Sequence, residues 1–379
     1  MKNSQGVSGT FPEDLAHARL APAALRFTAM PKNQKILRRP IRVGFVGLTD
    51  CAPLAVAKER GLFTARGIDV ELSREIGWAT IRDKILYGEL EAAHAPAGML
   101  VAAAAGLNTV PAPCLTGLVL NLHGNAIVLS QRIAKAGATD GHKLREHLRR
   151  KRERLTLGVV YHWSSHHVLL RQWLRDHGIN PDRDVQVVIV PPSQVYANLR
   201  AGHLDGYCVG EPWASLAVMQ RAGFVVARSA EIAPQHPEKV LMARGDFAER
   251  AQHDHLALIA ALIEACAWCE APENRDELVA LLARPEYVNA PAEALRMSMC
   301  GRYDYGLGRV EDCPGFNIFA RGEANVPTEA KAAWVMEGFV RTGLASREQL
   351  PADLGARCFR ADLYAQAQAL LSDSKSNAA

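Results

Sequence analysis

The stretch from Gly44 to Phe63 constrains the fold more than any other part of the chain. It contains an apolar segment over 42–48, a polar turn, and an amphipathic segment over 53–62, which predict a strand followed by a helix. The alternating segment 68–73 predicts a second strand, so the chain begins as a parallel strand–helix–strand unit. Open sheets of this kind bind ligands at the carboxyl ends of their strands. Because no glycine-rich phosphate loop precedes the helix, the pattern favours a small ligand over a nucleotide.

The composition indicates a packed globular protein. The chain has 379 residues, of which 49% are apolar and 22% charged, and this length is enough for two domains or lobes. The formal net charge of +4 is too small to predict nucleic-acid binding. Eight cysteines are too few for a disulfide framework in a chain this long, so we expect buried thiols in a reducing compartment.

The N-terminal region predicts a cytoplasmic protein. Residues 1–38 contain no apolar run typical of a secretion signal, and we expect them to form a flexible arm. Arg38 and Arg39 form a pair of the kind seen in export signals, but Pro40 follows and the next apolar run is short. No stretch approaches about 18 consecutive apolar residues, so we expect no membrane span.

Alternating strands and helices continue through two units. The first includes a helix over 78–88 and a strand over 92–96, and the second begins near 156. After Lys239 the pattern is mostly helical. We therefore expect an α/β protein with lobe I at 39–130 plus 240–379, lobe II at 131–239, and C-terminal helices packed on lobe I. A cleft between two such lobes is a preferred place for a ligand.

The segment from Lys143 to Arg154 is strongly basic and carries leucines four residues apart. This spacing predicts a helix with one apolar edge and a solvated charged face. A partner surface there remains an alternative. The absence of interleaved aromatic residues gives no support to RNA binding.

Four side chains at element ends could bind an anion. Trp78 begins a predicted helix after the second strand, His123 lies in a turn beside Gly124, His166 lies at a helix start, and Lys239 precedes an apolar strand. Indole, imidazole and ammonium groups are hydrogen-bond donors suited to an oxyanion. Three of these residues also have a structural interpretation: a core tryptophan, a solvent-exposed turn histidine at 123, and a surface lysine.

Other reactive groups do not form a convincing centre. His162 and His166 have helical spacing, but no carboxylate or thiol lies near them in the sequence, so we expect no metal and no cofactor. Cys266 and Cys269 lie inside a helical pattern, which argues against redox chemistry. Cys51 follows Asp50, whose charge raises a thiol pKa, so a nucleophilic role is disfavoured. No hydrolase or nucleotide-binding motif is present, and we expect no enzyme.

Several blocks of sequence resemble, in order, the nitrate/bicarbonate-binding proteins of ABC importers. They are residues 48–54, 78–84, 124–127, 166–174, 209–213 and 236–241. The resemblance runs from about 42 to about 345 and implies the two-lobed type II periplasmic-binding-protein fold, with C-terminal helices. It implies ligand contacts at the following positions: Trp78, His166, Gly210 and Lys239, with His123 standing where nitrate binders have glutamine and Asn125 as an additional donor. The bicarbonate binders use a bound calcium, and no matching acidic set is evident, which favours nitrate or nitrite.

Within this group, the chain is similar to cytoplasmic nitrate/nitrite sensors of the NasS type. That similarity implies nitrate or nitrite as ligand and a NasT-like RNA-binding antiterminator as partner, released when the anion binds. It implies no direct contact with nucleic acid and none with a membrane. Two alternatives remain: a solute-binding subunit of an ABC nitrate/nitrite transporter, and a desulfinase-like enzyme that uses Cys51.

Overall fold

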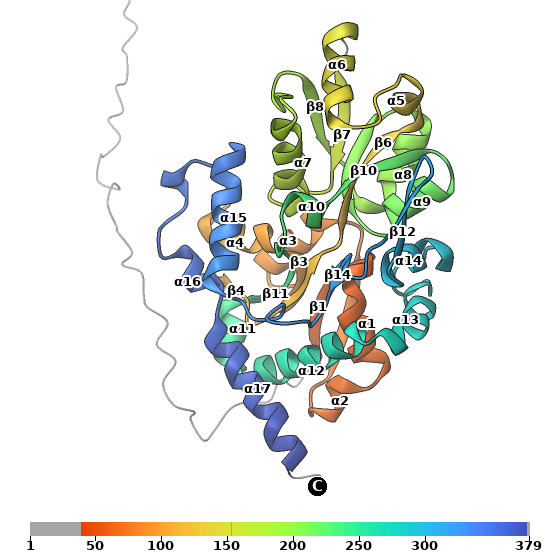
Figure 1. The fold of residues 1–379 in the computed structure, drawn as a ribbon. Coiled ribbons are helices and arrows are strands. Elements are labelled where there is room, and N and C mark those ends of the chain that lie inside the picture. Colours follow the sequence, from red (N-terminus) through yellow and green to blue (C-terminus); the bar gives the residue numbers. More distant parts are fainter. Residues whose placement is uncertain (1–38, 153, 377–379) are drawn as a thin grey trace, which may run out of the picture. The chain divides into compact units, whose positions relative to one another are not determined.

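The computed structural model describes residues 39–376 apart from residue 153, so the expected N-terminal arm at 1–38 lies outside the described residues. Two β-sheets organise the fold, which confirms the α/β, two-lobed architecture (Figure 1). The larger sheet consists of β1 (Ile41–Val46), β2 (Val70–Glu75), β3 (Ala92–Pro96), β4 (Cys114–Leu115), β5 (Val119–His123), β11 (Pro237–Arg244) and β14 (Asn317–Ile318). The smaller sheet consists of β6 (Asn125–Ser130), β7 (Leu155–Val159), β8 (Val185–Ile189), β9 (Gly206–Gly210) and β10 (Gly223–Arg228).

The first lobe is built on the predicted parallel unit. Strand β1 pairs in parallel with both β2 and β3, and α3 (Trp78–Leu86) lies between β2 and β3 in sequence. The helix expected at 53–62 is two helices, α1 (Ala52–Glu59) and α2 (Leu62–Ala65). Gly61 separates them with a φ of 67°, which ends the first helix. The long helix α12 (Gln252–Glu270) packs against α1 and α17 (Ala361–Ser376) (Figure 1).

The second lobe begins earlier than expected. Strand β6 pairs with β9 and β10, so residues 125–130 belong to the smaller sheet and not to lobe I. Strand β7 pairs in parallel with β8 and β9. The helices of this lobe are α5 (Gln131–Lys135), α6 (Gly141–Lys151), α7 (Ser165–Asp176), α8 (Pro192–Ala201) and α9 (Trp213–Met219).

The chain crosses between the sheets twice. The first crossing is the turn between β5 and β6, where His123 and Gly124 have φ values of 64° and 97°. A side chain at 124 would place its Cβ 2.4 Å from Asn317 Oδ1, so only glycine fits this turn. The second crossing passes through α10 (Ser229–Ile232) into β11, which returns to the larger sheet between β3 and β5.

The C-terminal part packs on both lobes, whereas the sequence predicted packing on lobe I. Helix α14 (Ala292–Met299) contacts α9, and the hairpin of β12 (Arg302–Gly306) and β13 (Arg309–Asp312) contacts β10. Tyr303 from this hairpin donates a hydrogen bond to Glu211 Oε1 at 2.5 Å. Helix α15 (Glu329–Thr342) contacts α7 in one lobe and α4 (Ala97–Ala105) in the other. The remaining helices are α11 (Gly245–Arg250), α13 (Arg275–Leu282) and α16 (Leu354–Cys358).

His255 is a polar residue in the apolar interior of α12. Its side chain is fully buried, its ring lies 5.6 Å from that of Phe247, and neither ring nitrogen has a hydrogen-bond partner. Burial lowers its pKa to about 4, and the charge of Arg360 acts in the same direction. Because the folded pKa lies below the unfolded value of about 6.5, the stability associated with this group is complete above pH 6.5 and is lost as the pH falls toward 4.

We expect His255→Leu to raise the free energy of unfolding at pH 7 by about 1–3 kcal/mol, because it removes unsatisfied buried polar atoms. It should also reduce the loss of stability between pH 7 and pH 5. Urea unfolding at both pH values measures the two effects. The matched control is His253→Asn, an exposed position on the same helix, which should change little. If His255→Leu lost as much free energy of unfolding between pH 7 and pH 5 as the wild-type protein does, this account would be contradicted.

Candidate functional site

A fully buried cluster of charges surrounds Lys239 at the middle of the larger sheet. Its ammonium group donates to Asp50 Oδ2 at 2.6 Å and to Glu238 Oε1 at 2.7 Å. It also lies 5.3 Å from the centre of the Trp78 ring, close enough for a cation–π contact. Lys239 and Glu238 have no exposed surface, and Asp50 is 1% exposed. One ammonium group is therefore the shared cationic partner of two buried carboxylates.

Strand and helix ends of the larger sheet position the first half of this cluster. Asp50 lies in the 3₁₀ turn Thr49–Cys51 between β1 and α1, and it accepts a hydrogen bond from His94 Nε2 at 2.8 Å. His94 belongs to β3, and its ring lies 5.3 Å from that of Trp78, the first residue of α3. These groups come from neighbouring strand ends, which is where the parallel unit places a ligand site.

The second lobe supplies the other half of the cluster, through side chains that bond to Glu238 of β11. Asn125 Nδ2 and Ser165 Oγ each donate to Glu238 Oε2 at 2.5 Å, and His166 Nε2 lies 3.7 Å from Oε1. Ser165 and His166 are the first residues of α7, whose preceding residue, Ser164, caps the helix by accepting from the His167 N–H. Residues of both lobes thus meet around one carboxylate.

A strand irregularity explains why two adjacent residues serve one cluster. Successive side chains of a regular strand point to opposite faces. The pairing of β11 with β5 shifts register on both sides of Lys239, between Pro237 and Lys239 and again before Val240. Glu238 and Lys239 are consequently bonded to each other although they are neighbours in the chain.

The electrostatics of the cluster leave it with two carboxylates and one ammonium at neutral pH. Burial alone raises the pKa of Glu238, but Lys239, His166 and His236 outweigh burial and lower it to about 2. Burial similarly opposes the charge of Asp50, yet Lys239 and then His94 hold its pKa below the usual range.

The two basic side chains Lys239 and His166 show pKa shifts in opposite directions. Burial lowers the pKa of Lys239, but Asp50 and Glu238 outweigh it and raise the pKa above the usual value. Burial lowers the pKa of His166 to about 4, with Glu238 opposing this shift, so its imidazole is neutral at pH 7. The cluster formed by Lys239, Asp50, Glu238 and neutral histidines carries a net charge of −1.

Several hydrogen-bonding atoms of the cluster have no partner. Trp78 Nε1, His94 Nδ1, both ring nitrogens of His166 and Asn125 Oδ1 are buried and form no hydrogen bond. Leaving such groups unsatisfied costs about 1–3 kcal/mol each, so they identify a place suited to a small polar ligand. The carboxylate oxygens are already engaged. Trp78 Nε1 and the protonated nitrogen of neutral His166 are free donors, whereas Asn125 Oδ1 and the other His166 nitrogen are free acceptors. The arrangement can therefore hold a compact polar ligand.

The structure brings together five of the six residues singled out from the sequence. Trp78, Lys239, Asn125 and His166 take part in the contacts above, and a Cβ built on Gly210 would lie 3.4 Å from Asn125 Oδ1 and 3.5 Å from Asp50 Oδ2. His123 lies apart from them. Its Nδ1 is 3.1 Å from the Gly315 carbonyl, and its Nε2 accepts from the Gln235 N–H at 2.8 Å. Both of its ring nitrogens are thus used within the crossover.

Sequence reasoning missed four polar members of the site: Asp50, His94, Ser165 and Glu238. Asp50 and Glu238 are the sequence neighbours of Cys51 and Lys239, which were considered for the site. A carboxylate is not expected beside a bound anion unless a cation such as Lys239 is known to pair with it. His236 is a further neighbour, with its Nδ1 3.8 Å from Glu238 Oε2 and its ring stacked on Trp334 of α15 at 5.0 Å. The available signal was the polar His-Pro-Glu-Lys run directly before an apolar strand.

The cysteine and metal alternatives find no geometry to support them. Cys51 is fully buried, and burial together with Asp50 raises its pKa well above the usual range, so its thiol is a poor nucleophile. His162 precedes α7, which begins at Ser165, so helical spacing does not apply to its pair with His166. Within residues 39–376, excluding 153, no group of three or more histidine, cysteine or acidic residues is placed to hold a metal ion.

Comparison with known proteins assigns the family. Residues 34–283 match the NMT1-like family, and the chain belongs to it. The chain is 32% identical over 340 residues to the nitrate/nitrite binding protein NrtA of Synechococcus elongatus, covering 86% of this chain and 77% of NrtA. It is 38% identical over 329 residues to the nitrate import ATP-binding protein NrtC of Synechocystis, covering 86% of this chain. The chain spans about half of NrtC, with 49% of its length matched.

A solved structure supports the same assignment. The periplasmic nitrate-binding protein NrtA from Synechocystis superposes with a TM-score of 0.81 and 28% identity, covering 87% of this chain and 89% of that one. The periplasmic-binding-protein fold expected from the sequence is thereby confirmed. The relatives named here are described as binding and import proteins.

The helices of the described region do not individually meet the requirements for a membrane span. No single one of them is both long and apolar enough to cross a bilayer. One pair, 252–270 with 272–282, reaches the length and composition only when joined across a bend of 86°.

We expect Lys239→Met to lower the free energy of unfolding by about 3–5 kcal/mol, because it leaves two buried carboxylates without their shared cation. Adding Glu238→Gln to this variant should recover part of the loss, since one of the two charges is removed. Urea unfolding measures both variants, with Lys143→Met at an exposed pair as the control. Wild-type stability in Lys239→Met would contradict the cluster as described.

Proposed function

We propose that this chain binds nitrate or nitrite between its two lobes and acts as a cytoplasmic sensor that controls a NasT-like RNA-binding antiterminator. The observation that carries the binding proposal is the set of unpartnered buried atoms of Trp78 and His166 beside the ammonium group of Lys239. The names of the relatives, nitrate/nitrite binding and nitrate import proteins, point to the same ligands.

The hydrogen-bonding capacity of the site favours a ligand that accepts but does not donate. Both oxygens of Glu238 are engaged by Lys239, Asn125 and Ser165, and those of Asp50 by Lys239 and His94. A ligand with an O–H group would find no free carboxylate oxygen to accept from it, only neutral acceptors such as Asn125 Oδ1, whose hydrogen bonds are weaker. Nitrate and nitrite have only acceptor atoms, so they match the Trp78 indole N–H and the one N–H of neutral His166.

The charge of the site favours a monovalent ligand. With two carboxylates and one ammonium, the cluster already has a net negative charge, and desolvating a divalent anion beside it is more costly than desolvating a monovalent one. Sulfate and hydrogen phosphate are disfavoured for this reason. Nitrate is also weakly hydrated by comparison, which suits a fully buried position.

Ligand contacts from both lobes couple binding to lobe position. Trp78 and Lys239 belong to the larger sheet's lobe, whereas His166 and Gly210 belong to the other. A ligand held by all four binds better when the lobes are together, and that difference in affinity is what shifts the population toward the closed form. The surface offered to a partner then depends on the ligand.

Cysteine state supports an intracellular location. All eight cysteines are free thiols, and seven of them are buried. Disulfides form in oxidising compartments and are rare in the reducing cytosol, so unpaired thiols throughout the chain are in keeping with a cytoplasmic sensor.

The second candidate function is a solute-binding subunit of an ABC nitrate/nitrite transporter. The observation that favours it is the similarity to NrtA, whose solved relative is described as periplasmic. Fractionation of cells that express the native protein discriminates the two. Recovery in the periplasm rules out the sensor, whereas recovery with cytoplasmic markers rules out the transporter subunit.

We expect isothermal titration to show one saturable site for nitrate or nitrite and much weaker binding of bicarbonate and sulfate. His166→Ala and Lys239→Ala should weaken nitrate binding strongly, because each removes a donor from a desolvated ligand. The control is His123→Asn, whose ring nitrogens face Gly315 and Gln235 and not the cluster. Unchanged affinity in a folded His166→Ala protein would contradict the site.

We expect the full chain to form a complex with a NasT-like antiterminator that dissociates when nitrate is added. Size-exclusion chromatography with light scattering measures the masses with and without nitrate. His166→Ala should form the complex but keep it when nitrate is present. If the two proteins do not associate, or if nitrate leaves the wild-type complex intact, the sensor proposal is wrong even where nitrate binding holds.

A further inference from the structure

A second, strongly basic pocket lies in the smaller lobe, away from the Lys239 cluster. It has a volume of about 260 Å³ and is formed where α6 and α7 end and β8 begins. Five arginines line it: Arg145, Arg149, Arg152, Arg154 and Arg183. His166 lies at the start of α7 and Gly178 of the pocket lies just beyond its end, so the helix separates the two sites by about 18 Å.

The arginines of this pocket are only partly used within the protein. Arg183 pairs with Asp184, the one acidic residue among the described residues of the lining, at 2.9 Å. Arg154 donates through Nε to the Val185 carbonyl at 3.2 Å, which fixes its direction. Arg145, Arg149 and Arg152 form no ion pair among the described residues, and Arg145 Nε is buried without a hydrogen-bond partner. Among the described residues of the lining, positive charge therefore exceeds negative charge.

Local backbone geometry brings Arg145 into place. Gly178 follows α7 with a φ of 70°, and a Cβ built there would lie 3.2 Å from both Cζ and Nε of the Arg145 side chain. Glycine allows the guanidinium group to lie against the chain at this point. Cations are common near helix C-termini, where one or two of them are enough to interact with the helix dipole. That interaction does not account for a concave arrangement of five arginines.

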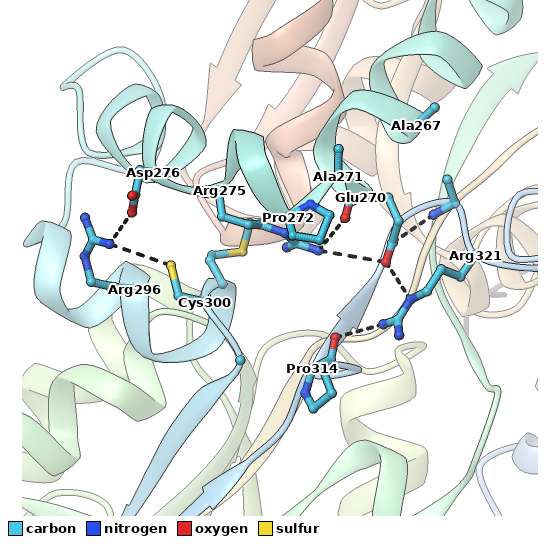
Figure 2. Close-up of a pocket in the computed structure, with 13 residues that line it drawn as sticks. Ala267, Glu270, Ala271, Pro272, Arg275, Asp276, Arg296, Cys300, Pro314 and Arg321 are labelled. Atoms are coloured by element: carbon cyan, nitrogen blue, oxygen red, sulfur yellow. Dashed lines mark hydrogen bonds and ion pairs between the residues drawn. The ribbon is translucent and has the colours of Figure 1, made fainter.

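A different pocket, beside α12 and α13, has arginines whose charges are balanced by acidic partners. Figure 2 shows this pocket of about 700 Å³ beside α12 and α13, lined by Arg275, Arg296 and Arg321. Arg321 lies 2.5 Å from Glu270, which is also 3.9 Å from Arg275, and Arg296 pairs with Asp276. Each arginine there has an acidic partner, so that pocket offers no comparable attraction for an anion.

We propose that the pocket lined by the five arginines binds a pyrophosphate group. A guanidinium group presents a planar fork that bonds two phosphate oxygens. Three such cations, without an acidic partner among the described residues, are matched in charge by two linked phosphates better than by one. The volume lies just below the range of about 300–1,000 Å³ for drug-sized ligands, so it suits such a group better than a whole nucleotide. The group is either free pyrophosphate or the exposed end of a nucleoside diphosphate.

Titration of the full chain with inorganic pyrophosphate at physiological salt tests this proposal. We expect one saturable site, with inorganic phosphate binding about tenfold or more weakly. Arg149→Gln should weaken pyrophosphate binding about tenfold. Arg150→Gln changes the next residue of the same helix, which does not line the pocket, and should leave binding unchanged. Thermal unfolding of both variants checks that each is folded.

The remaining arms of the experiment identify the source of the group. Equal binding of ADP and pyrophosphate assigns a nucleoside diphosphate, and binding of pyrophosphate alone assigns the free anion. The proposal is overturned if pyrophosphate shows no saturable binding, if Arg150→Gln weakens it as much as Arg149→Gln, or if only unstructured RNA binds.

Discussion

The shared bond of the Lys239 ammonium group to two buried carboxylates is the constraint on which the site depends. Charges without exposed surface are tolerated only when they are paired and their remaining hydrogen-bonding atoms are engaged. Asp50 comes from the turn after β1, Glu238 from the crossover strand, and Asn125 and Ser165 from the smaller lobe. If Lys239 or either carboxylate moved alone, a buried charge would lose its partner, so the network constrains the strand and helix ends around it.

Local patterns in the sequence were sufficient for the parallel strand–helix–strand start and for the placement of Trp78, His166 and Lys239 at element ends. Glu238 was not predictable, because a regular strand would point it away from Lys239, and only the register shifts of β11 bring the two together. The boundary of the second lobe was missed because apolar β6 looks the same in either sheet. The hairpin of β12 and β13 carries mostly polar and exposed residues in its second strand, so it gave no apolar alternation to detect.

The two proposed sites have opposite electrostatic character. The Lys239 cluster is buried and has a net negative charge, so hydrogen-bond donors more than charge would hold the proposed monovalent ligand. The described lining of the other pocket has more arginines than acidic residues, which suits the proposed pyrophosphate group. Helix α7 (Ser165–Asp176) carries His166 in its first turn and ends next to Gly178, so one helix connects the two places.

The packing of the C-terminal segment on both lobes has a consequence for how the protein is made. Residues 125–228 form the smaller sheet, yet α7, α9 and β10 are covered by α14, α15 and the β12–β13 hairpin, which emerge from the ribosome much later. At usual rates of translation this delay is on the order of ten seconds. During that interval the nascent second lobe exposes the faces that those elements will cover, which makes this lobe the natural client for a chaperone during synthesis.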